Sequence, residues 1–211
     1  GYNLIANINE LIAYVDKADT RMFTGRNYHL IRGEAYGLRA QMHFDLLRCF
    51  GKSYAAGPTE KAIPYITENS KKVTPLSTVE AVLAKILADL EIAESELQCD
   101  PVITGSVASP DDDVTYERDY AVKMLQARVY LYMGNYEKAE AAARVVVNQE
   151  SFTFTPESEI STTDVASKNY VFSQELVFAL YNSDLQSLYT ASFTPDNGLY
   201  MLEETYESLY E

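Results

Sequence analysis

The chain has 211 residues, of which 47% are hydrophobic and 23% are charged, a composition typical of folded globular proteins that excludes wholesale disorder. Its 31 acidic residues outnumber its 17 basic residues, and the resulting net charge of −14 argues against nucleic acid or an anionic membrane surface as a partner. It contains 17 Tyr and 8 Phe but no Trp, so many of its rings carry a hydroxyl group that can face water or a polar ligand.

Two helices are predicted in the first 50 residues. Apolar residues between Leu4 and Val15 recur at intervals of three and four, which predicts a helix from Asn3 to Thr20 with Asn3 as its cap. A longer helix is predicted from Asn27 to Phe50, ended by Gly51. The residues expected on the apolar face of this longer helix are Ile31, Ala35, Leu38, Met42, Leu46, Cys49 and Phe50.

A loop and a capped helix are predicted next. Gly and Pro interrupt the stretch from Lys52 to Pro75, which indicates a loop that packs locally. Ser77 and Glu80 have the spacing of a capping box, in which each side chain accepts a hydrogen bond from a free amide, and the apolar period that follows predicts a helix from Thr78 to Leu97. The apolar residues expected to anchor the loop are Tyr54, Ile63, Tyr65 and Ile66.

A helical hairpin is predicted from Tyr120 to Gln149, with its turn at Gly134 and Asn135. The segment from Ala121 to Met133 is apolar on almost every side, so we expect it to lie between neighbouring helices. The second helix carries a narrow strip of small residues that lets a partner helix approach closely. This strip consists of Ala139, Ala142, Ala143, Val146 and Val147.

The hairpin also matches the tetratricopeptide pattern. Its glycine, aromatic and alanine positions fall on Gly134, Tyr136 and Ala139. The small and tyrosine positions of the pattern then fall on Ala127 and Tyr130. An ordinary helical hairpin whose alanines match by chance is the alternative interpretation.

The connection before the hairpin and the region after it are expected to be irregular. Asp100 to Thr115 reads as a surface connection, and its acidic run from Asp111 to Asp113, followed by Glu117, lacks the glycine and final glutamate of an EF-hand loop. A solvated acidic turn is therefore favoured over a calcium site. After the hairpin we predict an edge strand at 152–154, an irregular stretch at 156–173, a buried strand at 175–181, a loop at 183–197 and a helix at 199–210.

The sequence offers no constellation for catalysis or for a metal. His29 and His43 have no third ligand at metal spacing and are interpreted as ordinary polar side chains of the long helix. Cys49 is interpreted as a core residue, and whether it is bridged to Cys99 stays open. Phosphate-binding loops and nucleophile elbows are absent, and no pair of carboxylates stands out as the acid and base of a glycosidase. We predict no catalytic residue, metal or cofactor.

Six segments in succession carry a resemblance to one protein family. They are YNLIANINELI, RGEAYGLRAQMHFDLLRCFG, IPYITE, VEAVLAKILADLEIAESEL, AVKMLQARVYLYMGNYEKA and QELVFAL. This succession covers essentially the whole chain and resembles the SusD/RagB family of outer-membrane lipoproteins from Bacteroidetes. The resemblance implies a mainly α-helical, SusD-like fold of tetratricopeptide-like helix pairs, with long irregular loops and at most minor strand. Residues 1–211 would form one such region, with the hairpin at 118–149 and a loop-rich segment at 150–211.

The resemblance also implies a function. Family members bind a glycan or another small nutrient at the cell surface, work with a TonB-dependent outer-membrane transporter of the SusC type, and are not enzymes. They are normally much longer than this chain and begin with a signal and a lipidated cysteine. We therefore expect the chain to be a soluble central fragment, truncated at both ends, whose only link to the membrane would be a lipid anchor that the chain itself lacks.

Ligand-binding residues are expected after the segment QELVF, because this part of the family often contributes to the ligand-facing side. Sugar rings pack on aromatic side chains while their hydroxyl groups need hydrogen-bond partners. The alternative is that these aromatic residues pack on the helices. The candidate ligand-binding residues are Tyr181, Asn182, Asp184, Tyr189, Phe193 and Tyr200.

Two rival functions are considered. One is a tetratricopeptide scaffold for protein–protein interaction, which requires further helix pairs in register, and the other is a glycosidase.

Overall fold

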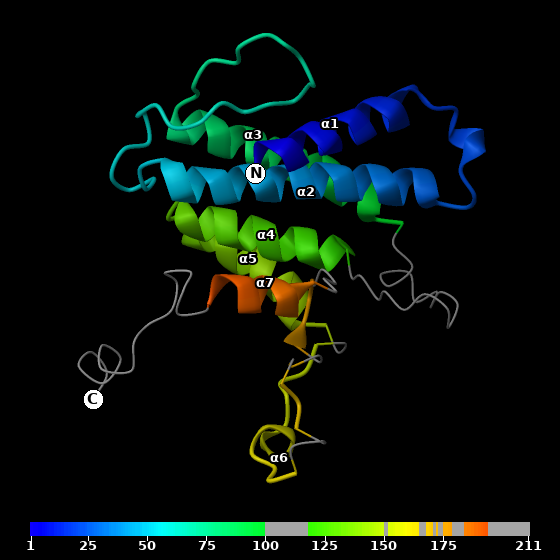
Figure 1. Cartoon of the computed structure of the whole chain (residues 1–211), viewed down its shortest axis with the longest axis vertical. Coiled ribbons are helices and arrows are strands. Elements are labelled where there is room, and N and C mark those ends of the chain that lie inside the picture. Colours follow the sequence, from blue (N-terminus) through cyan, green and yellow to red (C-terminus); the bar gives the residue numbers. More distant parts are fainter. Residues whose placement is uncertain are drawn as a thin grey trace. The chain divides into compact units, whose positions relative to one another are not determined.

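The computed structural model describes residues 1–99, 118–149, 152–164, 168–170, 172, 175–178 and 184–193. The chain divides into two compact units, Gly1–Phe178 and Ala179–Glu211. Helices dominate the described residues (Figure 1). They are α1 (Tyr2–Lys17), the 3-10 turn η1 (Thr20–Met22), α2 (Asn27–Phe50), α3 (Val79–Leu97), α4 (Arg118–Tyr132), α5 (Tyr136–Val147), α6 (Glu157–Ile160) and α7 (Leu185–Ser192).

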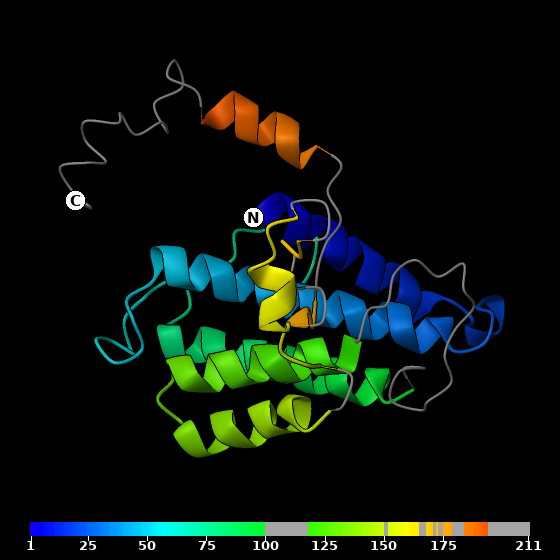
Figure 2. The same ribbon diagram turned by 90° about the horizontal axis from the view of Figure 1, so that it is seen from below.

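The helices of the first unit pack mainly against their neighbours in sequence. α1 contacts α2, α2 contacts α3, α3 contacts α4 and α4 contacts α5, while α2 also touches α4 (Figures 1 and 2). Within the described residues the only β-type pairing is an isolated antiparallel bridge between Lys61 and Thr78. The predicted mainly α-helical fold of tetratricopeptide-like helix pairs with long loops is therefore confirmed.

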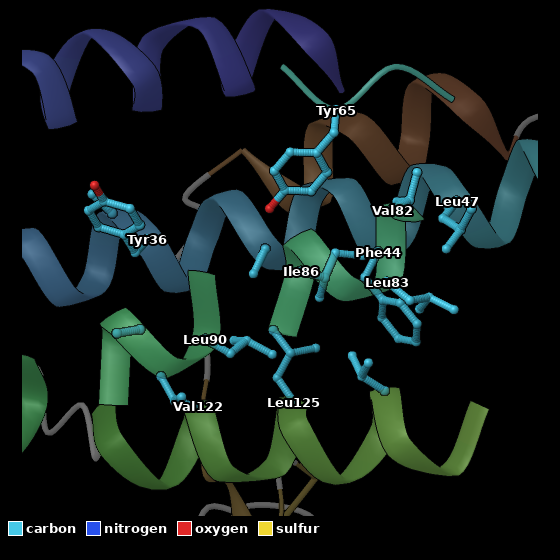
Figure 3. Close-up of a cluster of buried hydrophobic side chains, with 14 of the residues drawn as sticks. Tyr36, Phe44, Leu47, Tyr65, Val82, Leu83, Ile86, Leu90, Val122 and Leu125 are labelled. Atoms are coloured by element: carbon cyan, nitrogen blue, oxygen red, sulfur yellow. The ribbon is translucent and has the colours of Figure 1, made fainter. Parts of the chain in front are cut away.

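The core lies between α2, α3 and α4, and Figure 3 shows its side chains interdigitating. α3 lies at the centre of the core because its apolar residues recur along one face of the helix, and the residues of this face are fully buried. Each such side chain stabilises the fold by about 1.5–3 kcal/mol on burial. The core residues labelled on α2, α3 and α4 include Phe44, Leu47, Val82, Leu83, Ile86, Leu90, Val122 and Leu125.

The predicted bounds of α2 are confirmed, but of the seven residues predicted for its apolar face only Ala35 is buried. Cys49 is exposed and Phe50 is 73% exposed, so neither belongs to the core. The polar side chains of Arg39 and His43 are buried in their place. Apolar spacing missed this face because these two side chains satisfy their hydrogen bonds internally. The buried residues of α2 are Gly33, Ala35, Tyr36, Arg39, Ala40, His43, Phe44 and Leu47.

Two predicted helix caps are also wrong. α1 begins at Tyr2 with Gly1 at the N-cap, and no side chain caps it, so Asn3 is inside the helix. At α3, Thr78 is the cap, and its Oγ1 accepts a hydrogen bond from the amide of Ala81 at 3.3 Å. The expected box fails because the amide of Glu80 donates to the carbonyl of Pro58 at 2.9 Å, which joins the start of α3 to the preceding loop.

The turn between α4 and α5 falls at the predicted residues, Gly134 and Asn135. Gly134 adopts φ 73°, a left-handed conformation that residues with a Cβ rarely adopt. Asn135 caps α5 by accepting a hydrogen bond from the amide of Lys138 at 3.2 Å. The predicted strip is confirmed at Ala139, Ala142 and Val146, which are buried, while Val147 is 76% exposed because α5 turns this position to solvent.

The region after α5 departs most from expectation. The predicted strand at 152–154 does not form, and residues 175–178 form none either; a three-residue alternation finds no partner strand in the described residues. α6 lies inside the stretch expected to be irregular, and α7 replaces much of the loop predicted at 183–197. That loop prediction followed from the polar composition of the stretch, which did not reveal the helical segment Leu185–Ser192 within it. The acidic run at 111–113, Glu117 and the helix predicted at 199–210 lie outside the described residues.

Candidate functional site

The predicted ligand-binding residues lie on and around α7. Asp184 is the residue at the N-cap of this helix. Tyr189 and Phe193 are one helical turn apart, and their rings are stacked with centroids 5.2 Å apart and planes inclined by 24°. Tyr189 is 61% exposed and Phe193 is 49% exposed, so the pair presents aromatic surface to solvent. The other predicted residues, Tyr181, Asn182 and Tyr200, lie outside the described residues.

A second candidate site lies at one end of the helices, and we call it the tyrosine groove. One wall comes from the loop after α2 and the other from the turn between α4 and α5. It is a depression of about 550 Å³ that is open to solvent, so a ligand held there would stay partly exposed. The groove is lined by Tyr54, Ala55, Pro58, Leu131, Tyr132, Met133, Gly134 and Tyr136.

The helical wall of the tyrosine groove is fixed by Tyr132. Its hydroxyl group donates to the carbonyl of Lys52 at 3.2 Å, and its ring packs edge-on against Phe44 with centroids 5.6 Å apart. Tyr132 therefore ties the groove to both the loop and the core. Tyr136, just past the turn, leaves 71% of its surface exposed.

The loop wall is fixed by main-chain hydrogen bonds. The carbonyl of Ser53 accepts from the amides of Ala56 and Gly57, at 3.0 and 3.1 Å, which closes a tight turn behind Tyr54. The hydrogen bond from Glu80 to Pro58 then holds the other end of this turn on α3. The groove is thus preformed, and a ligand would not have to order its walls.

A buried polar cluster anchors the rest of this loop. The guanidinium of Arg39 on α2 donates two hydrogen bonds of 2.7 Å to the carboxylate of Asp89 on α3. The hydroxyl group of Tyr65, in the loop, donates to the same carboxylate at 2.5 Å. Burial and the neighbouring Asp89 charge raise the pKa of Tyr65, so its hydroxyl stays protonated as a donor. All three residues are at least nine-tenths buried.

His43 holds the loop at Ile66. Its Nε2 accepts a hydrogen bond from the amide of Ile66 at 3.0 Å, so its Nδ1 carries the proton and donates to the carbonyl of Arg39 at 2.9 Å. The ring stacks on Tyr65 with centroids 3.8 Å apart, and burial lowers the pKa of His43 to about 4. The interpretation of His43 as an ordinary polar side chain is therefore wrong. Asn9 of α1 completes the attachment by donating to the carbonyl of Ile66 at 3.0 Å.

The described residues contain no group of three or more His, Cys, Asp or Glu side chains placed to hold a metal ion. Cys49 and Cys99 are not bridged to each other, which answers the question the sequence left open. His29 pairs with Glu96, at 2.6 Å from Nδ1 to Oε2. Across the part of the chain that the structure describes, no helix combines the length and apolar character that a membrane span requires.

Sequence reasoning missed the tyrosine groove because its two walls are far apart in the chain. Tyr54 was expected to anchor the loop and Tyr136 to fill a repeat position. One signal was present, namely tyrosines beside Gly and Pro breaks at both places. Nothing in the sequence indicated that these two breaks meet.

Residues 1–131 match a protein-family model described as SusD-like_3, starch-binding associating with outer membrane. The SusD-like protein P38 of Formosa agariphila is 29% identical to this chain over 123 residues, which are 58% of this chain and 21% of that protein.

Solved structures show the same similarity. A SusD superfamily protein from Bacteroides fragilis is 27% identical with a TM-score of 0.66, covering 87% of this chain and 39% of that one. One from Bacteroides thetaiotaomicron is 25% identical with a TM-score of 0.61, covering 75% of this chain and 33% of that one. A SusD-like carbohydrate binding protein from Bacteroides vulgatus, 19% identical, has a TM-score of 0.68 over 92% of this chain and 39% of its own, a likeness of fold. The chain thus spans well under half the length of these relatives.

Proposed function

This chain belongs to the SusD-like family, and on that premise we propose that it takes part in binding a glycan or another small nutrient at the cell surface. The membership confirms the resemblance found in the sequence. The observation that carries the proposal is the match of residues 1–131 to a family described as starch-binding and associating with the outer membrane. The helical platform described above is the scaffold on which such binding would take place.

The proposed mechanism is capture without chemistry. Aromatic rings stack on the apolar face of a sugar, and polar groups bind its hydroxyl groups. We assign this role to the exposed ring pair of Tyr189 and Phe193 and to Asp184 at the start of α7. We include Tyr181, Asn182 and Tyr200 from the same stretch of sequence. Because the protein only holds its ligand, incubation with a bound glycan should release no hydrolysis products.

The proposed partner is a TonB-dependent outer-membrane transporter of the SusC type, and the proposed location is the outer face of the outer membrane. This part of the proposal rests on the family resemblance. It is tested by co-purification of such a transporter with the tagged chain from outer-membrane extracts. Recovery of the chain without any transporter would count against the partnership.

Ligand binding can be tested on the whole chain by isothermal titration calorimetry with a panel of neutral glycans that includes maltoheptaose, a fragment of starch. The variants Tyr189→Ala and Phe193→Ala should each weaken binding by roughly 2- to 12-fold, the range of an aromatic contact worth about 0.5–1.5 kcal/mol. The matched control is Tyr14→Ala, because Tyr14 on α1 is also an exposed tyrosine, at 72%. A parent chain that binds no glycan of the panel would contradict the proposal.

The tetratricopeptide scaffold is not favoured by the described structure. A scaffold of this type stacks helix pairs in a regular array. Here the loop between α2 and α3 interrupts the array and is fastened to the helices by the buried cluster of Arg39, Asp89 and Tyr65.

A further inference from the structure

We propose that the tyrosine groove is a binding subsite for one neutral sugar ring, formed by residues other than those assigned on and around α7. This inference rests on the proposed function and extends it to a second set of residues. It follows from three observations: the residues that line the groove are uncharged, its walls are held by hydrogen bonds and packing, and the ring of Tyr136 is exposed at its open side.

The lining favours a neutral ligand. None of its eight residues carries a charged side chain, although the chain as a whole has a net charge of −14. Lys52 and Glu60, which flank the groove in sequence, pair with each other at 3.2 Å. An ionic ligand would therefore lose its hydration without gaining a counter-charge, whereas a sugar carries no charge to desolvate.

The lining also offers what a sugar ring needs. Tyr54, Tyr132 and Tyr136 supply aromatic surface for the C–H groups of a pyranose. The phenols of Tyr54 and Tyr136 can exchange hydrogen bonds with a sugar hydroxyl group, and the Tyr132 oxygen, whose O–H donates to Lys52, can accept one. Leu131, Met133 and Pro58 supply further apolar surface.

Two of the three tyrosines form the walls of the groove, and the third is free to contact a ligand. Tyr132 is held by Lys52 and Phe44, and Tyr54 packs partly against the core, so both are rigid walls. Tyr136 is 71% exposed, which is more surface than a helix-packing role requires. A ring placed at the open side of a preformed groove can stack on a ligand at little entropic cost. Tyr136 is therefore the residue whose removal tests binding with the least damage to the fold.

The experiment uses the whole chain and the glycan of the panel that binds most tightly to the parent. Tyr136→Ala should weaken binding by roughly 2- to 12-fold, as expected for one aromatic contact. Leu131→Glu, which replaces apolar surface of the lining with a charged side chain, should also weaken it because the apolar contact with the sugar ring is lost. The matched controls, Tyr14→Ala at 72% exposure and Val147→Glu at 76% exposure on α5, should bind as the parent does.

A second measurement locates the ligand directly. The chain has five methionines, and with ¹³C-labelled methyl groups the Met133 signal should shift on addition of the glycan while that of Met22, 79% exposed on η1, should not. If the parent binds a glycan but the groove variants bind equally well and Met133 does not shift, the subsite is wrong and the proposed function stands. If the parent binds no glycan, the proposed function itself is wrong and the subsite is wrong with it.

Discussion

Acidification should destabilise the fold through His43. The buried ring must stay neutral, because its Nε2 accepts a hydrogen bond from Ile66. Burial lowers the pKa of His43 from 6.5 to about 4, so between these values the unfolded chain binds a proton that the folded chain does not. The contribution to stability is fully present above pH 6.5 and is lost as the pH falls toward 4. Its full size is about 3 kcal/mol, and the loss between pH 7 and pH 5 is about 2 kcal/mol.

The assay is urea unfolding followed by far-UV circular dichroism at pH 7 and pH 5. Carboxylates also titrate near this range, so the relevant quantity is the difference between the parent and His43→Gln, whose amide cannot take up a proton. His29→Gln is the control, because it removes the other histidine, which lies at an exposed site. Its free energy of unfolding should fall between pH 7 and pH 5 by as much as that of the parent, since His43 is still present. Equal losses in the parent and in His43→Gln would refute the reasoning. If His43→Gln does not fold, NMR titration of the parent gives the same answer, since the His43 ring should still be neutral at pH 5.

Two further predictions concern packing between α2 and α3. Arg39→Met should lower the free energy of unfolding by about 3–5 kcal/mol in urea titrations, because it leaves the Asp89 carboxylate buried without its cation. The double variant Arg39→Met with Asp89→Leu should be more stable than Arg39→Met alone, and a double variant that is less stable would contradict this account. Gly33→Ala should cost about 1–3 kcal/mol and lower the midpoint of thermal unfolding, because the new Cβ would lie 2.5 Å from Cγ of Leu97. The same change at Gly37, where the nearest atom is 3.6 Å away, is the control and should cost less.

The fold was largely predictable because its helices have strong local signals. The apolar period of α3 and the Gly134 turn are visible in a few neighbouring residues. α2 was placed correctly but its buried face was not, because apolar spacing cannot indicate that Arg39 meets Asp89, fifty residues away. Local patterns report which segments are helical, and they say little about which polar groups are satisfied by distant partners.

The candidate sites were predictable to different degrees. Tyr189 and Phe193 are four residues apart, so once α7 is a helix their stacking follows from its geometry. The tyrosine groove depends instead on the meeting of Tyr54 and Tyr136, which are separated by two helices and a long connection. Only the packing of α4 beside α2 and α3 brings them together.

The attachment of Ile66 to α1 and α2 has a practical consequence for engineering this protein. The loop is held firmly up to this point, whereas residues 67–73 are exposed, with Val73 at 95%. A fluorescent label or a short inserted sequence in this outer arc would be separated from the groove by the Ile66 anchor. Residues 67–73 therefore offer a place to immobilise the protein on a surface while both candidate ligand sites keep their native residues.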